Sequence, residues 1–141
     1  MSKIIVGTDG SECSQRALRW AVEEGRLRAC PVHVIYAVDW RALKEAIFVT
    51  PSQTEVDKEA QGVLDRSVAE LGDVSDVQIK TRVMHVEDRH GPSAVMLDAA
   101  DKEVDLVVVG TRGSGAVKGA LIGSVSHRLL HFAHCPVVVV P

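Results

Sequence analysis

Short runs of β-branched residues alternate with longer amphipathic stretches along the whole chain of 141 residues. The short runs, typical of buried strands, lie at residues 3–8, 32–38, 77–86, 105–109 and 137–140. The stretches between them have apolar residues at helical spacing, at residues 11–29, 54–71, 92–102 and 124–132. Because each helix carries the chain back across the sheet, the strands must pair in parallel. We therefore predict a single α/β domain of residues 1–141, a three-layer doubly wound sheet of five parallel strands with four helices.

Composition narrows the possible partners and location of the chain. Hydrophobic residues make up 46% and charged residues 25%, which is the balance of a soluble globular protein. The formal net charge of −3 leaves no basic excess for a long polyanion, so nucleic acid is not an expected partner. No apolar run is long enough for a transmembrane helix, and the start, Met-Ser-Lys, has no signal-peptide pattern. Cys13, Cys30 and Cys135 are odd in number and widely spaced, so we expect a reducing, cytoplasmic location.

Acidic residues and a glycine-rich segment follow the predicted strands. Asp9 follows the first strand, Asp39 the second, and Glu87 and Asp88 the third, while the fourth strand runs directly into Gly110. In doubly wound folds, ligands bind outside the carboxyl ends of the strands, where the strand order reverses. We therefore expect a binding site at this edge, although Asp39, Glu87 and Asp88 also fit a role as exposed loop acids.

The segment 110–123 is the strongest functional signal in the sequence. Its glycines allow backbone N–H groups to approach an anion, and the helix start that follows adds N–H donors and serine hydroxyls. The residues concerned are Gly110, Gly113, Gly115, Gly119, Gly123, Ser124 and Ser126. These features predict a phosphate-binding loop, and the alternative is a loop whose glycines only satisfy turns. A Walker A loop is excluded because Ala116 replaces its lysine, and a dinucleotide fingerprint is excluded because Lys118 replaces its third glycine.

The spacing of these residues is similar to that of a known nucleotide loop. Gly110-x-x-Gly113, nine residues, and then Gly123-Ser124 resembles the loop of the universal stress protein family. The resemblance extends to the opening KIIVGTDGS, the fourth strand DLVVVGTRG and the ending GSVSHRLLHFAHCPVVVV. It points to the ATP-binding branch of the family and implies an adenine nucleotide alpha hydrolase-like fold, ATP as ligand and Mg²⁺ as its companion ion.

The resemblance also implies a role for individual residues. Thr8 and Asp9 correspond to the turn at the ribose or beside the phosphates, where Asp9 is also the candidate Mg²⁺ ligand. Ala37 and Val38 correspond to the backbone segment that meets the adenine. The expected contacts to the ribose and phosphates come from Gly110, Arg112, Gly113, Gly115, Gly123, Ser124, Val125 and Ser126. The resemblance further implies a homodimer through the last strand, Val137–Val140, and a nucleotide-dependent regulatory role toward other proteins in a stress response.

Three alternatives stay open at this point. The chain is either a binding module without catalytic residues or a slow Mg²⁺-dependent ATP hydrolase that uses Asp9 to position water. Arg89 stands where the family usually has a glycine, so Arg89 and His90 either reach the phosphates or are solvated. His127, His131 and His134 have the spacing of one helix face, which is compatible with zinc ligands or with a polar surface.

Overall fold

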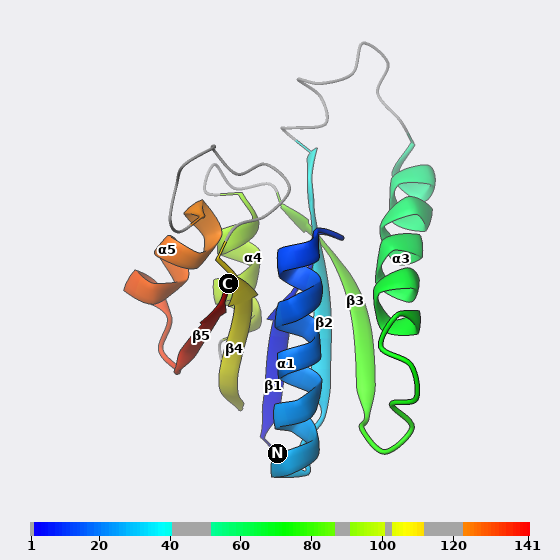
Figure 1. Ribbon diagram of the computed structural model, residues 1–141. Coiled ribbons are helices and arrows are strands. Elements are labelled where there is room, and N and C mark those ends of the chain that lie inside the picture. Colours follow the sequence, from blue (N-terminus) through cyan, green and yellow to red (C-terminus); the bar gives the residue numbers. More distant parts are fainter. Residues whose placement is uncertain (1, 41–51, 87–90, 101–102, 112–122) are drawn as a thin grey trace.

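The computed structural model describes residues 2–40, 52–86, 91–100, 103–111 and 123–141 of the chain. Strands and helices alternate in the predicted order (Figure 1). The elements are β1 (Lys3–Gly7), α1 (Glu12–Arg28), β2 (Val32–Asp39), α3 (Gln53–Ala69), β3 (Ile79–Val86), α4 (Pro92–Ala99), β4 (Val104–Gly110), α5 (Ser124–Phe132) and β5 (Val137–Val140). None of the described helices combines the length and the apolar character that a membrane span requires.

The sheet has the strand order β3-β2-β1-β4-β5, and all neighbouring strands are parallel. The central strand β1 pairs with β2 on one side, with Ile4 opposite Val32, and with β4 on the other, with Ile4 opposite Leu106. The chain therefore builds the sheet outward from β1 to β3 and then returns to the other side of β1 to add β4 and β5. This reversal places the expected ligand crevice at the carboxyl ends of β1 and β4.

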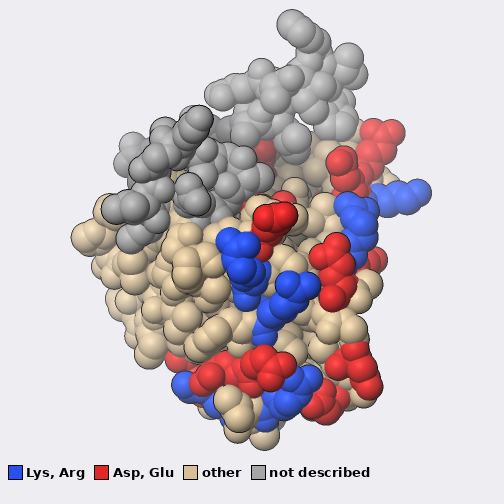
Figure 2. All heavy atoms as spheres, viewed as in Figure 1, with Lys and Arg blue, Asp and Glu red and all other residues tan. Residues whose placement is uncertain are grey.

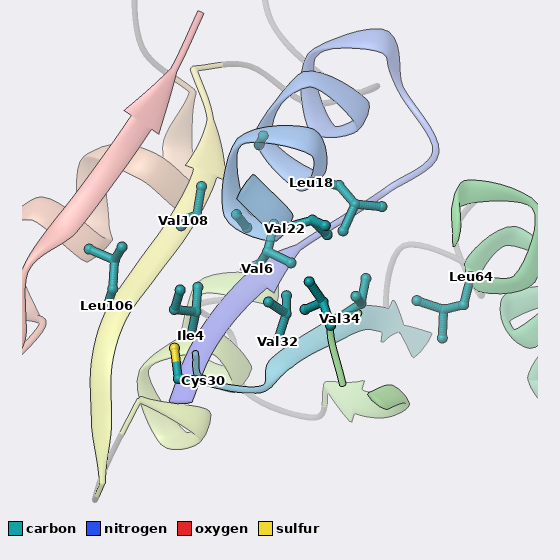
Figure 3. Packing of buried hydrophobic residues seen from close by; sticks show 13 residues of the cluster. Ile4, Val6, Leu18, Val22, Cys30, Val32, Val34, Leu64, Leu106 and Val108 are labelled. Carbon is teal, nitrogen blue, oxygen red and sulfur yellow. The ribbon is translucent and has the colours of Figure 1, made fainter. Parts of the chain in front are cut away.

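Helices cover both faces of the sheet and enclose two cores. Because side chains alternate along a strand, Ile4 and Val6 of β1 point toward α1, while Ile5 points toward α4 and α5. The core under α1 and α3 includes Leu18 and Leu64 (Figure 3). The second core, on the opposite face, contains residues of α4 and α5. The predicted three-layer arrangement is confirmed, with an aliphatic core on each side of the sheet.

Helix α1 packs unusually close to β2, because it has a glycine where the two elements meet. A Cβ atom on Gly25 would lie 2.6 Å from Cγ2 of Val32 and 3.1 Å from the carbonyl oxygen of Cys30. These distances leave no room for a larger residue without movement of the backbone. Gly25 therefore sets the depth at which α1 lies on the sheet, and with it the position of the first turn of α1 at the opposite end.

Two helix starts are capped by serine side chains. Ser11 accepts a hydrogen bond from the backbone N–H of Ser14 at 3.2 Å, so Ser11 and not Ser14 is the cap of α1. Ser52 forms a capping box with Glu55 at the start of α3. Most strand boundaries lie within one residue of the prediction, but β3 begins at Ile79 and not at Val77. The backbone N–H of Val77 donates to the carbonyl of Val74 in a turn, which removes it from the strand.

Candidate functional site

The turn after β1 is fixed by its own polar side chains. Asp9 Oδ1 accepts a hydrogen bond from the backbone N–H of Ser11 at 3.0 Å, and Thr8 Oγ1 accepts one from the N–H of Gly10 at 3.3 Å. Gly10 has a φ of 82°, which favours glycine. Thr8 is buried, and its hydroxyl lies 3.0 Å from that of Ser14 in the first turn of α1. The carboxylate of Asp9 is thereby held at the edge of the sheet beside the start of α1.

The phenol of Tyr36 reports the negative charge near this turn. Burial is the main cause that raises the pKa of Tyr36, and the carboxylates of Asp9 and Glu59 raise it further. Tyr36 comes from β2 and Glu59 from α3, so the carboxylates of two different elements act on the same phenol. A polyphosphate placed near Asp9 would experience the same negative potential unless a cation accompanied it.

The end of β2 offers backbone groups toward the crevice. Within the described residues, β1 pairs with β2 no further than Gly7 and Ile35, and the N–H of Thr8 donates to the Ile35 carbonyl at 2.9 Å. The ladder with β3 continues through Ala37 and Val38 on the other side. Because the backbone groups of successive strand residues point to opposite sides, those of Ala37 face the β1 side, as those of Ile35 do, and those of Val38 face β3. The backbone of Ala37 thus extends beyond its strand neighbour, as an edge that can hydrogen-bond to a ligand.

Gly110 brings the end of β4 against the first turn of α1. A Cβ atom there would lie 2.7 Å from Cys13 Sγ and 3.1 Å from the backbone carbon of Cys13. The thiol of Cys13 also lies 3.4 Å from the carbonyl oxygen of Val140 and 3.5 Å from Oγ1 of Thr111. The start of the glycine-rich segment is therefore adjacent to the helix that begins two residues after Gly10.

Hydrogen bonds join the two ends of the glycine-rich segment. The backbone N–H of Gly123 donates to the carbonyl of Thr111, and the N–H of Thr111 donates to the carbonyl of Val140 at 2.9 Å. The hydroxyl of Ser126 lies 2.8 Å from the Gly110 carbonyl oxygen, to which it donates, and 3.3 Å from that of Thr111. The start of α5 is consequently tied to the end of β4.

The first turn of α5 differs from those of α1 and α3. Its cap residue is Gly123, which provides no side-chain hydrogen bond, whereas Ser11 and Ser52 satisfy N–H groups at the other two starts. The first N–H groups of a helix have no partner within the helix and carry a partial positive charge. With Ser124 exposed beside them, this helix start has the donors that bind an anion.

The structure brings most of the predicted site residues to one edge, but the side chains of some of them contact the protein itself. Thr8, Asp9, Gly110, Gly123 and Ser124 lie on segments that meet there, as do Ala37 and Val38 at the end of β2. The hydroxyl of Ser126 is buried and bonded to the protein, and the side chain of Val125 packs into the core. Those two residues offer only backbone groups to a ligand. Arg112, Gly113, Gly115, Arg89 and His90 lie outside the described residues.

Two features of this edge were missed by the sequence analysis. One is Cys13, whose contact with Gly110 joins residues far apart in the chain. The other is Trp40, whose indole contacts His85 of β3. Both depend on strand register and on helix placement, for which a single sequence carries no direct signal. The pattern of alternation along β3, which places His85 on the same face as Val83, was the available hint.

The predicted histidine face is only partly formed. His127 and His131 lie on α5 with ring centroids 4.7 Å apart, but α5 ends at Phe132, so His134 is not on the helix. In the part of the chain that the structure describes, no three histidine, cysteine or acidic side chains are placed to hold a metal ion. The expectation that all three histidines share one helix face is therefore wrong.

The chain belongs to the universal stress protein family, because the family model, described as Universal stress protein family, matches residues 1–141. A universal stress protein of Mycolicibacterium smegmatis is 36% identical over 143 residues, which cover 97% of this chain and 47% of the relative. The chain thus spans about half the length of the curated relatives that it matches. The resemblance predicted from the glycine spacing is confirmed.

Solved structures confirm the fold. A universal stress protein in complex with cAMP has a TM-score of 0.75 at 21% identity, with 99% of this chain and 97% of that chain covered. The universal stress protein from Archaeoglobus fulgidus in complex with dAMP also has a TM-score of 0.75, at 23% identity, with 100% and 98% covered. The parallel five-stranded α/β architecture is therefore shared along the whole length of these chains.

Ser126 and Ser124 give a matched pair of substitutions at the start of α5. Ser126→Ala removes the donor to the buried Gly110 carbonyl, and we expect it to lower the free energy of unfolding by about 1–3 kcal/mol. Ser124→Ala at the exposed position should change it by less than about 0.5 kcal/mol. Urea denaturation of both variants checks this, and equal stabilities would contradict a structural role for the Ser126 hydroxyl.

Proposed function

We propose that the chain is an adenine-nucleotide-binding module that takes ATP with Mg²⁺ at the carboxyl ends of β1 and β4. The observation that carries this proposal is the start of α5. It has no side-chain cap, and Ser126 and Gly123 tie it to the end of β4 beside the turn of Asp9. An anion at this point would satisfy N–H groups that Gly123, as the cap residue, does not bond through a side chain.

The geometry supports a direction for the nucleotide. The β1-facing backbone of Ala37, next to Val38, has the hydrogen-bonding groups that a base needs, and it lies at the end of β2. Gly123 and Ser124 lie on the other side of β1, beyond β4. We therefore place the adenine at β2 and the phosphates at α5, so that the ribose lies over the turn of Thr8 and Asp9. Gly110, Arg112, Gly113 and Gly115 belong to the segment that would close over the ribose and phosphates.

A divalent cation resolves the charge conflict at this site. Asp9 raises the pKa of Tyr36 and would repel a triphosphate placed next to it. Mg²⁺ prefers oxygen ligands and binds through one or two carboxylates together with substrate phosphates. We propose that Asp9 is the protein group nearest the ion, and that the ion joins it to the phosphates. The side chain of Arg112 would offset further negative charge.

Two relatives support adenine as the base. One universal stress protein was solved in complex with cAMP and that of Archaeoglobus fulgidus with dAMP, so both ligands are adenine nucleotides with a single phosphate. We infer a triphosphate from the length of the glycine-rich segment and from the start of α5, which has no side-chain cap. Nucleotide occupancy would then regulate which protein partners the module binds in a stress response.

Binding fits the described residues better than hydrolysis does. A hydrolase needs a group that positions the attacking water and donors that stabilise the charge of the transition state. Asp9 is the candidate for the first task, but its Oδ1 accepts the backbone N–H of Ser11 and so helps to hold the turn. We therefore propose weak or no ATP turnover. Mg²⁺-dependent turnover that Asp9→Asn abolishes would reverse this ranking.

The two edges of the sheet differ in a way that supports a homodimer through β5. The edge strand β3 exposes Lys80 and Arg82, charges of the kind that discourage edge-to-edge pairing. The edge strand β5 consists of four half-buried valines, Val137–Val140. Figure 2 shows that Lys, Arg, Asp and Glu gather over α1 and α3, whereas the surface on the side of α5 and β5 is mostly uncharged. We propose that two copies pair through β5 in a reducing cytoplasm, in which the three cysteines stay as thiols, as they are in the structure.

A charge placed at the start of α5 separates binding from folding. Ser124→Asp adds a negative charge that favours a helix N-terminus but repels phosphate. We expect unchanged or slightly higher stability and a loss of Mg-ATP affinity of at least about tenfold, since tenfold corresponds to only about 1.4 kcal/mol. Isothermal titration with Mg-ATP measures the affinity. Gln78→Glu adds the same charge directly before β3, at the amino ends of the strands, and should bind Mg-ATP as the unaltered chain does. Equal affinity in all three proteins would refute this placement of the phosphates.

A proline in β5 tests the proposed dimer. The carbonyls of Pro136 and Val140 accept hydrogen bonds from β4, so the alternating backbone groups of Val137 and Val139 point to the free edge. Val139→Pro removes one outward N–H while it leaves the pairing with β4 intact. We expect this variant to sediment as a monomer, and Val139→Ala, which keeps the N–H, to sediment as a dimer. A dimer of unchanged affinity in Val139→Pro would exclude β5 as the interface.

A further inference from the structure

Three polar side chains from three elements form a line beside the end of β2. The indole Nε1–H of Trp40, the residue after β2, donates to Nδ1 of His85 in β3 at 2.7 Å. The two rings are within 11° of parallel, with centroids 5.7 Å apart. On the other side of the imidazole, Nε2 lies 2.8 Å from Oδ1 of Asp57 in α3. His85 therefore connects the end of β2 to α3.

The contact between Trp40 and His85 requires one protonation state of the imidazole. Indole nitrogen is only a donor, so Nδ1 of His85 accepts and must carry no proton. Protonation would set two N–H groups against each other and break this contact. In the neutral ring the proton is on Nε2, which lies 2.8 Å from the buried Oδ1 of Asp57. A second proton on Nδ1 therefore breaks the contact to Trp40 and adds a positive charge beside Asp57, while Nε2 faces Asp57 in both states.

Few other charged groups lie in contact with this imidazole. On β2, the residue paired with His85 is the apolar Val38. On α3, the residue one turn after Asp57 is Gln61, whose amide bonds to Thr81 of β3 and to Asp65. The carboxylate of Asp39 lies near Gly91, at the start of α4 on the opposite face of the sheet. Among the described residues, Asp57 is the charged side chain in contact with the ring.

The contact also acts on the part of β2 that is proposed to meet the base. Val38 is paired with His85, and Trp40 follows two residues later. We propose that His85 is a proton-sensitive positioning residue of the nucleotide site: its neutral ring fixes Trp40 and the end of β2, and its protonation releases Trp40 and weakens nucleotide binding. The ligand in this inference rests on the proposed function, whereas the release of Trp40 does not.

The release of Trp40 can be measured without any nucleotide. In ¹⁵N-labelled protein, the indole N–H resonance of Trp40 is followed from pH 8 to pH 5, with Trp20→Phe to assign it. Histidine ordinarily changes charge in this range. We expect one protonation transition that moves this resonance away from its hydrogen-bonded position. In His85→Gln, a carboxamide can accept the indole N–H but gains no proton, so the resonance should not move.

A second histidine of the sheet provides the matched control. His33 lies on β2, on the face opposite to His85, where burial first, and then Lys3, Lys80 and Arg82, lower its pKa. His33→Gln should leave the transition of the Trp40 resonance unchanged. A resonance that does not respond to pH in the unaltered chain, or that responds equally in His85→Gln, would overturn the proposed contact switch.

Nucleotide affinity then tests the connection to the site. Between pH 7.5 and pH 5.5, the affinity for Mg-ATP should fall about three- to tenfold more in the unaltered chain and in His33→Gln than in His85→Gln, the effect of one hydrogen bond. This comparison cancels the titration of ATP itself. An equal fall in all three would overturn the connection. Failure to bind Mg-ATP at either pH would refute the proposed function instead, while the indole resonance would still decide whether His85 releases Trp40.

Discussion

The close approach of β4 to the first turn of α1 is the contact on which the rest of the site depends. Because Gly110 has no Cβ, the end of β4 lies directly against Cys13, and the turn of Asp9 is its neighbour. From that point, Ser126 and Gly123 attach α5 to Gly110 and Thr111. The first turns of two helices and the ends of three strands are in this way brought to one edge. A larger residue at Gly110 would separate them.

The sequence was sufficient for the architecture, because the architecture depends on local patterns. Runs such as KIIVG and DLVVVG can be buried on both faces, and helical spacing between them leaves only parallel pairing. The same reasoning predicted which segments meet at one edge, since the carboxyl ends of parallel strands lie together. The Gly110 and Gly123 spacing added the family, which the full-length match of the family model confirms.

The sequence did not show which side chains are buried and bonded within the protein and which stay exposed. Ser124 and Ser126 are the same residue type, two positions apart, yet one is exposed and the other is buried with its hydroxyl on Gly110. Only the position of α5 relative to β4 distinguishes them. The contact of Trp40 with His85 depends in the same way on the register of β2 and β3. Local propensity carries no information on such contacts, so the sequence predicted which segments meet at this edge but not the contacts that each side chain makes there.

The nucleotide content of the freshly purified protein shows whether this edge binds an adenine nucleotide. The protein would be denatured, and any released nucleotide identified by chromatography and quantified per chain. We predict close to one ATP per chain, because slow turnover and many backbone contacts favour retention of the intact triphosphate. Mostly ADP would favour the hydrolase. A protein that releases no nucleotide and also fails to bind added Mg-ATP would contradict the account.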